Sequence, residues 1–215
     1  MNTRATAILV TLLIALSVLA GIFLYPRLPD PVASHWNAKG QVDGYIPRFW
    51  GAFLMPIVSA GMVLMFLLIP LIDPLKANIA RFRTTFNTFI VLLIVFLFYV
   101  HGLSLAWNLG YRFDMGTVLM PAMGLLFFYI GVLMQRAKRN WFIGIRTPWT
   151  LSSDTVWDET HRLGGILFKI AGVLALAGVF FGQYAIWLVL IPVIGVAIFL
   201  LVYSYVLFQR ETSQA

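Results

Sequence analysis

Residues 85–107 read TFNTFIVLLIVFLFYVHGLSLAW, a run of chain that contains no Asp, Glu, Lys or Arg. A helix of about 20 apolar residues is long enough to cross roughly 30 Å of hydrocarbon. Comparable apolar runs occur at 5–25, 49–72, 115–135, 163–182 and 184–208. Of the 215 residues, 61% are hydrophobic and 11% are charged, which is far from the composition of a soluble domain. The sequence therefore predicts an all-α fold, a polytopic integral membrane bundle with six transmembrane helices.

Lys and Arg are distributed unevenly between the two ends of these spans. We expect the side that holds both termini to carry all but four of the 15 basic residues. The four on the other side are Arg27, Lys39, Arg48 and Arg112. Because loops rich in Lys and Arg stay in the cytoplasm, an N-in and C-in topology is predicted. The formal net charge of +7 then reflects topology, and we expect no direct contact with nucleic acid.

The first distinctive loop, 25–45, lies on the predicted outer side. Its three early prolines favour an extended and stiff chain, and turns are predicted at 37–40 and 43–44. We interpret this loop as a contact surface for a ligand or peptide. The alternative is a loop that folds over the helix ends and uses its polar groups to satisfy local backbone. The candidate contact residues are Pro29, Asp30, His35, Trp36, Asn37, Gly40, Asp43 and Tyr45.

The second distinctive loop, 136–162, lies on the predicted cytoplasmic side. Its first part mixes aromatic, apolar and basic residues, as segments that lie in the membrane interface do. We interpret the loop as a docking site for a cytoplasmic partner; the alternative is an interfacial anchor with a helix cap. The candidate docking residues are Gly144, Arg146, Thr147, Pro148, Trp149, Thr150, Ser153, Asp154, Trp157, His161 and Arg162.

A helix is predicted in the later part of this loop. Ser152 or Ser153 is expected to cap it, and it should run straight into the fifth span. Val156, Trp157 and Thr160 should then share one face, with His161 at the edge of that face. Asp158 and Arg162 are spaced to form an ion pair along the helix.

Few polar groups fall inside the spans. His101 is the clearest ionisable case, and a histidine that is satisfied by a neighbouring helix is its simplest interpretation. Pro56, Pro121 and Pro192 each remove a backbone donor, so neighbouring groups must satisfy the freed carbonyls.

Motifs for catalysis are lacking. The nearest text to a zinc-protease helix is Asp158-Glu159-Thr160-His161, which has no first histidine, and no Gly-x-Ser-x-Gly elbow occurs. The absence of Cys excludes thiolate metal sites and disulfides. We therefore expect no enzyme, no catalytic residues, no cofactor and no metal site. A small transporter or channel-like protein stays open as the alternative function, although the spans lack the charges and repeated halves of many transporters.

The two loops resemble known families. The outer loop, with Tyr25-Pro26, Leu28-Pro29-Asp30, His35-Trp36-Asn37, Gly40 and Asp43-Gly44-Tyr45, resembles the motif of a domain of unknown function, DUF1648. The inner loop, with Gly144 to Leu151 followed by Ser153-Asp154, Val156-Trp157 and Thr160-His161-Arg162, resembles the signature of the SdpI immunity-protein family. The resemblance implies a DUF1648-like module at 1–72 and an SdpI-like module at 73–215.

The resemblance also implies a function. Members of the SdpI family are expected in the bacterial plasma membrane, where they give resistance to a secreted antimicrobial toxin peptide. The family's namesake also acts as a receptor, and its toxin-bound form is thought to hold a small DNA-binding repressor at the membrane. The partners implied for this chain are membrane lipid, a secreted toxin peptide at the outer loop and a cytoplasmic transcriptional repressor at the inner loop.

Overall fold

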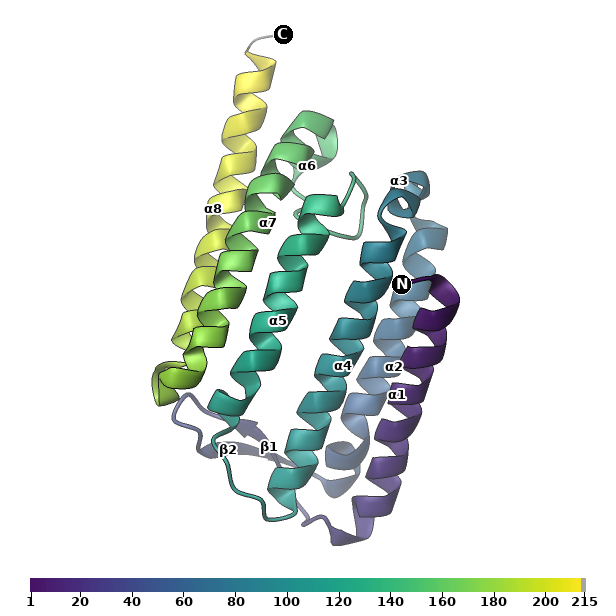
Figure 1. Ribbon diagram of the computed structural model, residues 1–215, viewed down its shortest axis with the longest axis vertical. Helices are drawn as coiled ribbons and strands as arrows, with labels where there is room; N and C mark the ends of the chain where they lie inside the picture. The colour runs from purple at the N-terminus through teal and green to yellow at the C-terminus, as the bar shows by residue number, and fades with distance from the viewer. Residues whose placement is uncertain (214–215) are drawn as a thin grey trace.

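The structure is a computed structural model that describes residues 1–213. Over these residues, six long helices run side by side (Figure 1), and each is long and apolar enough to cross a membrane. They are α1 (Thr3–Leu24), α2 (Arg48–Ile72), α4 (Arg83–Asn108), α5 (Met115–Arg136), α7 (Asp154–Ala177) and α8 (Trp187–Thr212). The predicted bundle of six transmembrane helices is thereby confirmed, and the chain is a multi-pass membrane protein.

Short elements join the long helices. A 3-10 turn, η1 (Tyr25–Arg27), and an antiparallel hairpin of β1 (Val32–Trp36) and β2 (Val42–Ile46) connect α1 to α2. At the other end of the bundle lie α3 (Lys76–Arg81) and α6 (Pro148–Ser152). Two more 3-10 turns, η2 (Gly178–Phe180) and η3 (Gly182–Tyr184), link α7 to α8. The hairpin is thus a small β element on an otherwise helical fold.

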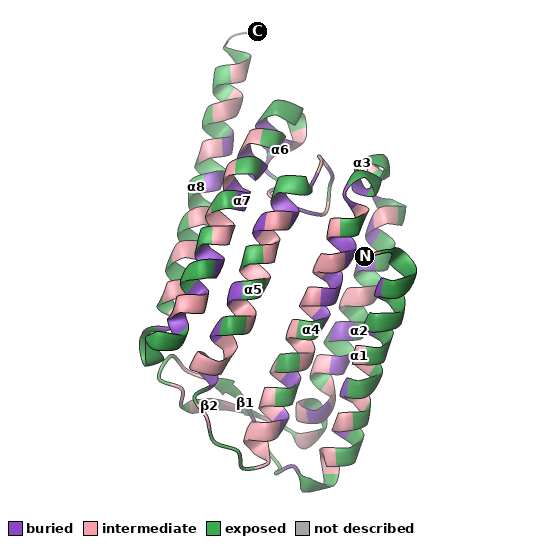
Figure 2. Ribbon diagram, in the orientation of Figure 1, coloured by how far each residue is buried: buried purple, intermediate pink, exposed green. Residues whose placement is uncertain are grey.

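The long helices pack as two groups. The first group is α1, α2 and α4, and the second group is α5, α7 and α8; the contact of α4 with α5 joins them (Figure 1). Buried residues lie mainly on the sides of the helices that face one another, and exposed residues cover the outward sides (Figure 2). Those outward sides carry large apolar residues such as Ile8, Leu71 and Ile191, as expected for a surface that meets lipid.

Glycines bring α5 and α7 into backbone contact within the second group. A Cβ added at Gly131 would collide with the carbonyl oxygen of Gly165, and one at Gly172 would lie 2.7 Å from that of Gly124. Without side chains at these positions the two backbones approach closely, which strengthens van der Waals packing between membrane helices.

Helix α7 confirms the predicted cap and corrects a predicted ion pair. Ser153 is its N-cap, and the side chain accepts a hydrogen bond from the Val156 N–H at 3.2 Å. The predicted ion pair between Asp158 and Arg162 is not formed. Asp158 instead pairs with Lys138 at 3.0 Å, and Arg162 pairs with Glu159 one residue nearer along the helix, at 2.7 Å.

The outer loop confirms one predicted turn and corrects the other. Residues 37–40 do form the turn of the hairpin, where the Gly40 N–H donates to the Asn37 carbonyl at 2.9 Å. The turn at 43–44 is wrong, because both residues belong to strand β2. Gly44 fits there because it lies opposite His35, whose Cβ would be 2.9 Å from a Cβ at position 44.

The start of α1 and the end of α8 both lie at the end of the bundle away from the hairpin (Figure 1), as an even number of spans requires. The assignment of that end to the cytoplasm rests on the distribution of Lys and Arg and remains a prediction. Below, the hairpin end is called the outer end and the opposite end the inner end.

Candidate functional site

The outer hairpin is fastened to the first helix group. The Asn108 side chain, near the end of α4, pairs with the backbone of Ala33: it accepts from the N–H at 2.8 Å and donates to the carbonyl at 2.9 Å. The Val32 side chain packs directly on Gly51 of α2, and a Cβ at position 51 would collide with it. Strand β1 therefore has a defined seat on α4 and α2, and the hairpin is a built surface.

The turn of the hairpin reaches the second helix group. The Asn37 side chain accepts hydrogen bonds from the backbone N–H groups of Lys39 and Gln41, at 2.9 and 3.1 Å. Gly40 has a φ of 72°, a conformation that favours glycine, and a Cβ there would collide with Asp114. Asp114 in turn caps α5 by accepting from the Thr117 N–H at 2.6 Å. The hairpin thus contacts both helix groups.

Aromatic and charged side chains surround this seat. The Trp36 ring lies edge-on to Trp107 with centroids 5.5 Å apart, and the Arg112 guanidinium lies 3.8 Å from the Trp107 centroid. The imidazole of His35 and the carboxylate of Asp43 are 2.5 Å apart on the exposed side of the hairpin. The Trp36 indole N–H is buried and has no hydrogen-bond partner within residues 1–213. The Trp36 ring also borders a space between the hairpin and the helix ends.

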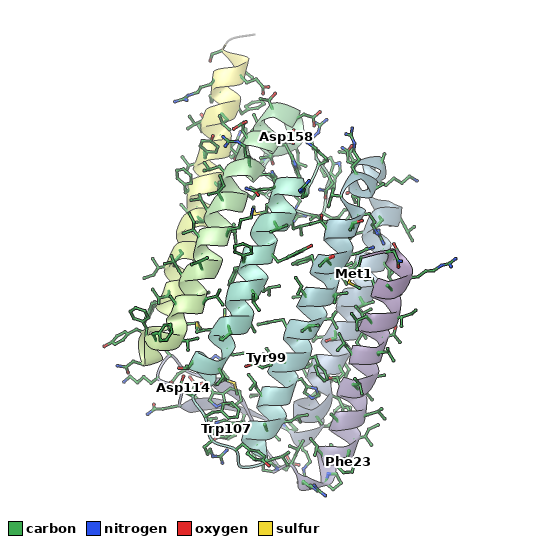
Figure 3. The ribbon with its side chains drawn as sticks, in the orientation of Figure 1. Met1, Phe23, Tyr99, Trp107, Asp114 and Asp158 are labelled. Atoms are coloured by element: carbon green, nitrogen blue, oxygen red, sulfur yellow. The ribbon has the colours of Figure 1, made fainter. Side chains whose placement is uncertain are left out.

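That space is a cavity of about 540 Å³ beneath the hairpin. Three of the predicted contact residues, His35, Trp36 and Asn37, line it together with side chains from both helix groups. Figure 3 shows the side chains of Trp107 and Asp114 at this end of the bundle, and Asp114 is one of the lining residues. The remaining lining is mostly apolar and includes Met55, Met115, Met120, Met123 and Trp187. Such a cavity suits an apolar group that carries a few polar atoms.

The other predicted outer residues are not part of the lining, although Gly40 lies against Asp114, which is part of it. Asp30 accepts a hydrogen bond from the Arg48 N–H at 3.2 Å and so helps to start α2. Pro29 and Tyr45 are exposed, and Asp43 holds His35. The structure therefore brings part of the predicted surface to one cavity and spreads the rest over the outside of the loop.

At the inner end, buried amide and carboxylate groups shape the loop between α5 and α7. Asn140 is fully buried; its side chain accepts from the N–H groups of Phe142 and Ile143 and donates to the carbonyls of Lys138 and Ile143. Asp73, at the end of α2, accepts from the Trp141 N–H at 2.9 Å. These bonds give a loop without regular structure a single conformation.

His161 holds the next part of this loop. The Ile145 N–H donates to its Nε2 at 2.9 Å, so the proton resides on Nδ1, which donates to the Trp157 carbonyl at 2.8 Å. The imidazole is therefore neutral, and it stacks on the Trp157 ring with centroids 3.9 Å apart. The backbone of Gly144 lies against the imidazole of His161, and a Cβ at this position would collide with Nε2. Its φ of 113° is also a conformation that favours glycine.

The Thr-Pro-Trp-Thr segment ties α6 to its surroundings. Thr147 and Thr150 form a capping box at the start of α6, and the Thr147 hydroxyl also lies 3.1 Å from the Ser204 hydroxyl of α8. The Trp149 ring lies against Tyr205 of α8, with centroids 5.1 Å apart. The structure thus packs this part of the motif against the last helix.

The predicted docking residues divide by burial. Thr147, Thr150, Trp157 and His161 are buried, so their side chains are not accessible at the surface of the loop. The exposed residues of the set are Gly144, Arg146, Pro148, Asp154 and Arg162, and Trp149 and Ser153 are partly exposed. Arg146 also lines a second cavity of about 750 Å³, which lies at the inner end between the two helix groups.

His101 belongs to neither loop. Pro56 has no N–H to donate to the Ala52 carbonyl, and His101 Nε2 donates to that carbonyl instead, at 3.1 Å. The Ser17 hydroxyl of α1 donates to Nδ1 at 2.5 Å. The expectation that neighbouring helices satisfy His101 is confirmed, and the histidine ties the first helix group together.

Several residues of these sites were not anticipated from the sequence. Asp114 stands directly before an apolar run, which is an N-cap signal that could have identified it. The roles of Asn108, Asp73 and Ser17 depend on partners that are 68 to 84 residues away along the chain. Within residues 1–213, no group of three His, Asp or Glu side chains is arranged to hold a metal ion.

Two regions of the chain match models of known protein families. Residues 136–204 match the model of the SdpI/YfhL protein family, and residues 12–60 match that of the domain of unknown function DUF1648. The chain is 26% identical over 201 residues to the immunity protein SdpI of Bacillus subtilis (strain 168), which covers 93% of this chain and 94% of that relative. No solved structure matches.

Proposed function

Because the chain carries the SdpI/YfhL family region at 136–204 behind a DUF1648 region at 12–60, we propose that it is a bacterial membrane immunity protein. It protects its host cell from a secreted toxin peptide. The observation that carries this proposal is the similarity to an immunity protein along 93% of the chain, loops and spans together. The division into modules at 1–72 and 73–215 is part of the same proposal.

The outer cavity is the proposed binding site for the toxin. It opens beneath a hairpin that is seated on α4 through Asn108, so its wall is preorganised and loses little entropy on binding. Its methionine-rich lining adapts to apolar side chains of different shape. The Trp36 ring adds an aromatic wall against which an apolar side chain of the peptide can pack.

Survival of toxin-sensitive cells tests this proposal. The chain is expressed in a strain without its own immunity gene, and the cells are exposed to peptide toxins against which members of this family protect. The chain should raise survival, and Trp36→Ala should remove most of the protection. The matched control is Trp50→Ala at an exposed position on α2. If the intact chain reaches the membrane at normal levels and protects against none of these toxins, the immunity function is wrong.

The inner loop is the proposed contact for a cytoplasmic repressor. Its exposed residues stand on a framework that His161, Asn140 and Asp73 hold in one conformation, which suits recognition by a preformed surface. Replacing Arg146 and Trp149 by Ala should release a fluorescent repressor from the membrane, whereas Arg210→Ala on α8 should not. Unchanged recruitment at normal protein levels would count against docking at this loop.

One observation favours transport as a second candidate function. A cavity lies at each end of the bundle between the two helix groups, as expected of a protein that alternates access between two sides. Collapse of the proton gradient separates the two functions. Protection by toxin binding persists without the gradient, whereas protection by gradient-driven export is lost with it.

A further inference from the structure

A hollow of about 520 Å³ is lined by residues from the start of α4 and the end of α5. Both of these helix ends lie at the inner end of the bundle (Figure 1). Four basic side chains line the hollow: Arg81 and Arg83 around the junction of α3 with α4, and Arg136 and Lys138 around the end of α5. Among the described residues its lining contains no Asp or Glu. The hollow is distinct from both the outer cavity and the inner loop cavity.

Three of these four cationic side chains form no ion pair with a carboxylate within residues 1–213. Lys138 is paired with Asp158 at 3.0 Å. Arg83 lies over the Phe86 ring at 5.8 Å, a contact that leaves its charge in place. Arg81 and Arg136 are exposed, and neither forms a side-chain hydrogen bond or ion pair within residues 1–213. Three arginines therefore line the hollow, and none of its described lining residues carries a carboxylate. A guanidinium group can donate two parallel hydrogen bonds to the oxygens of one phosphate.

The start of α4 borders the same hollow. Thr84 and Thr85 line it, and this 26-residue helix has no side-chain cap at its N-terminus. Backbone N–H groups in the first turn of a helix point outward without partners, and the helix dipole favours an anion there. The arginines that line the hollow and the uncapped helix start thus favour the same kind of ligand, a phosphate group.

The level of the hollow in the membrane indicates the source of that phosphate. The candidate span of α4 begins at Arg83 and that of α5 ends at Arg136, so the hollow lies where spans meet lipid headgroups. Phe82 and Val132 add apolar wall beside the charges, which suits the start of an acyl chain. Basic pockets between membrane helices bind anionic headgroups in this way. We propose that this hollow binds the phosphate of an anionic phospholipid.

Native mass spectrometry of the purified full chain tests the proposal. The probes are phosphatidylglycerol and phosphatidylcholine with the same acyl chains, and inorganic phosphate in a separate arm. Phosphatidylglycerol should bind in preference to phosphatidylcholine. Arg81→Gln and Arg136→Gln should each weaken that binding about fivefold, from the contribution of one cation near an anionic surface. Arg210→Gln, which removes an exposed arginine from the end of α8, should leave it unchanged.

The controls separate loss of the site from loss of the fold. Arg136→Lys keeps the charge and should retain most of the binding, and every variant must stay monodisperse in detergent. Equal retention of the two lipids, or full binding in the Arg81→Gln/Arg136→Gln double variant, would overturn the proposal. Full displacement of the lipid by inorganic phosphate would overturn the lipid assignment. Toxin protection is measured separately, since it depends on the outer end of the chain.

Discussion

Replacement of His101 by Leu should uncover the carbonyl that Pro56 leaves without a helical partner. His101 is 1% exposed, so no water replaces its hydrogen bond to the Ala52 carbonyl. An unsatisfied buried acceptor costs about 1–3 kcal/mol. The Ser17 hydroxyl loses its acceptor as well, but it can bond within its own helix at little cost. We therefore expect His101→Leu to lower the free energy of unfolding by about 1–3 kcal/mol.

A second substitution makes this reasoning specific. Pro56→Ala restores an N–H four residues after Ala52, so the Ala52 carbonyl gains a helical partner that does not depend on His101. The cost of His101→Leu should then fall by about 0.6–1.7 kcal/mol, the range measured for polar couplings between membrane helices. The control is Pro121→Ala in α5, whose effect should add to that of His101→Leu within about 0.5 kcal/mol.

Unfolding by SDS in mixed micelles, followed by tryptophan fluorescence, measures these free energies. The original chain, the two single variants and the His101→Leu/Pro56→Ala double variant are compared under one condition. If His101→Leu costs the same with and without Pro56→Ala, the Ala52 carbonyl is not what His101 stabilises, and the interpretation is refuted.

Two further substitutions test the two loops. Gly144→Ala should lower the free energy of unfolding in the same SDS assay by about 1–3 kcal/mol, because a non-glycine residue is strained at a φ of 113° and its Cβ would meet His161. Gly102→Ala, whose Cβ meets no described atom within 4 Å, should be neutral or stabilise its helix by up to about 1 kcal/mol; a larger loss there than at position 144 would contradict the argument. Asn108→Leu removes both hydrogen bonds to Ala33 and should speed amide exchange in the hairpin about tenfold, while exchange in α7 stays constant. Unchanged exchange in β1 would show that other contacts hold the hairpin.

The fold was predictable from the sequence because a membrane span is recognised from the length and hydropathy of one continuous run of residues. Each run of apolar residues long enough to span hydrocarbon became a helix, and Ser153 marked the start of α7 as a serine cap should. The hairpin at 32–46 was harder, since its strands are five residues each. Asp43-Gly44 has the composition of a turn, and only the pairing with β1 places it within a strand.

The candidate sites were predictable in part. The two loops were identified by their composition, and the structure shows that His35, Trp36 and Asn37 reach one cavity. Which motif residues are buried could not be inferred, because burial of Trp157 and His161 depends on how the loop folds back over α7. The contribution of Asn108 depends on a strand 75 residues earlier in the chain, and no local pattern records such a distance.

The link between Ser17, Ala52 and His101 also has a consequence for biosynthesis. A chain is made from its N-terminus, so α1 and α2 reach the membrane before α4 does. During that interval the Ala52 carbonyl and the Ser17 hydroxyl lack their histidine. The hydrogen bonds that His101 makes to α1 and α2 therefore cannot form until α4 has been made. A nascent chain that stops before residue 101 lacks these hydrogen bonds, although it already contains all of residues 12–60, which match the DUF1648 model.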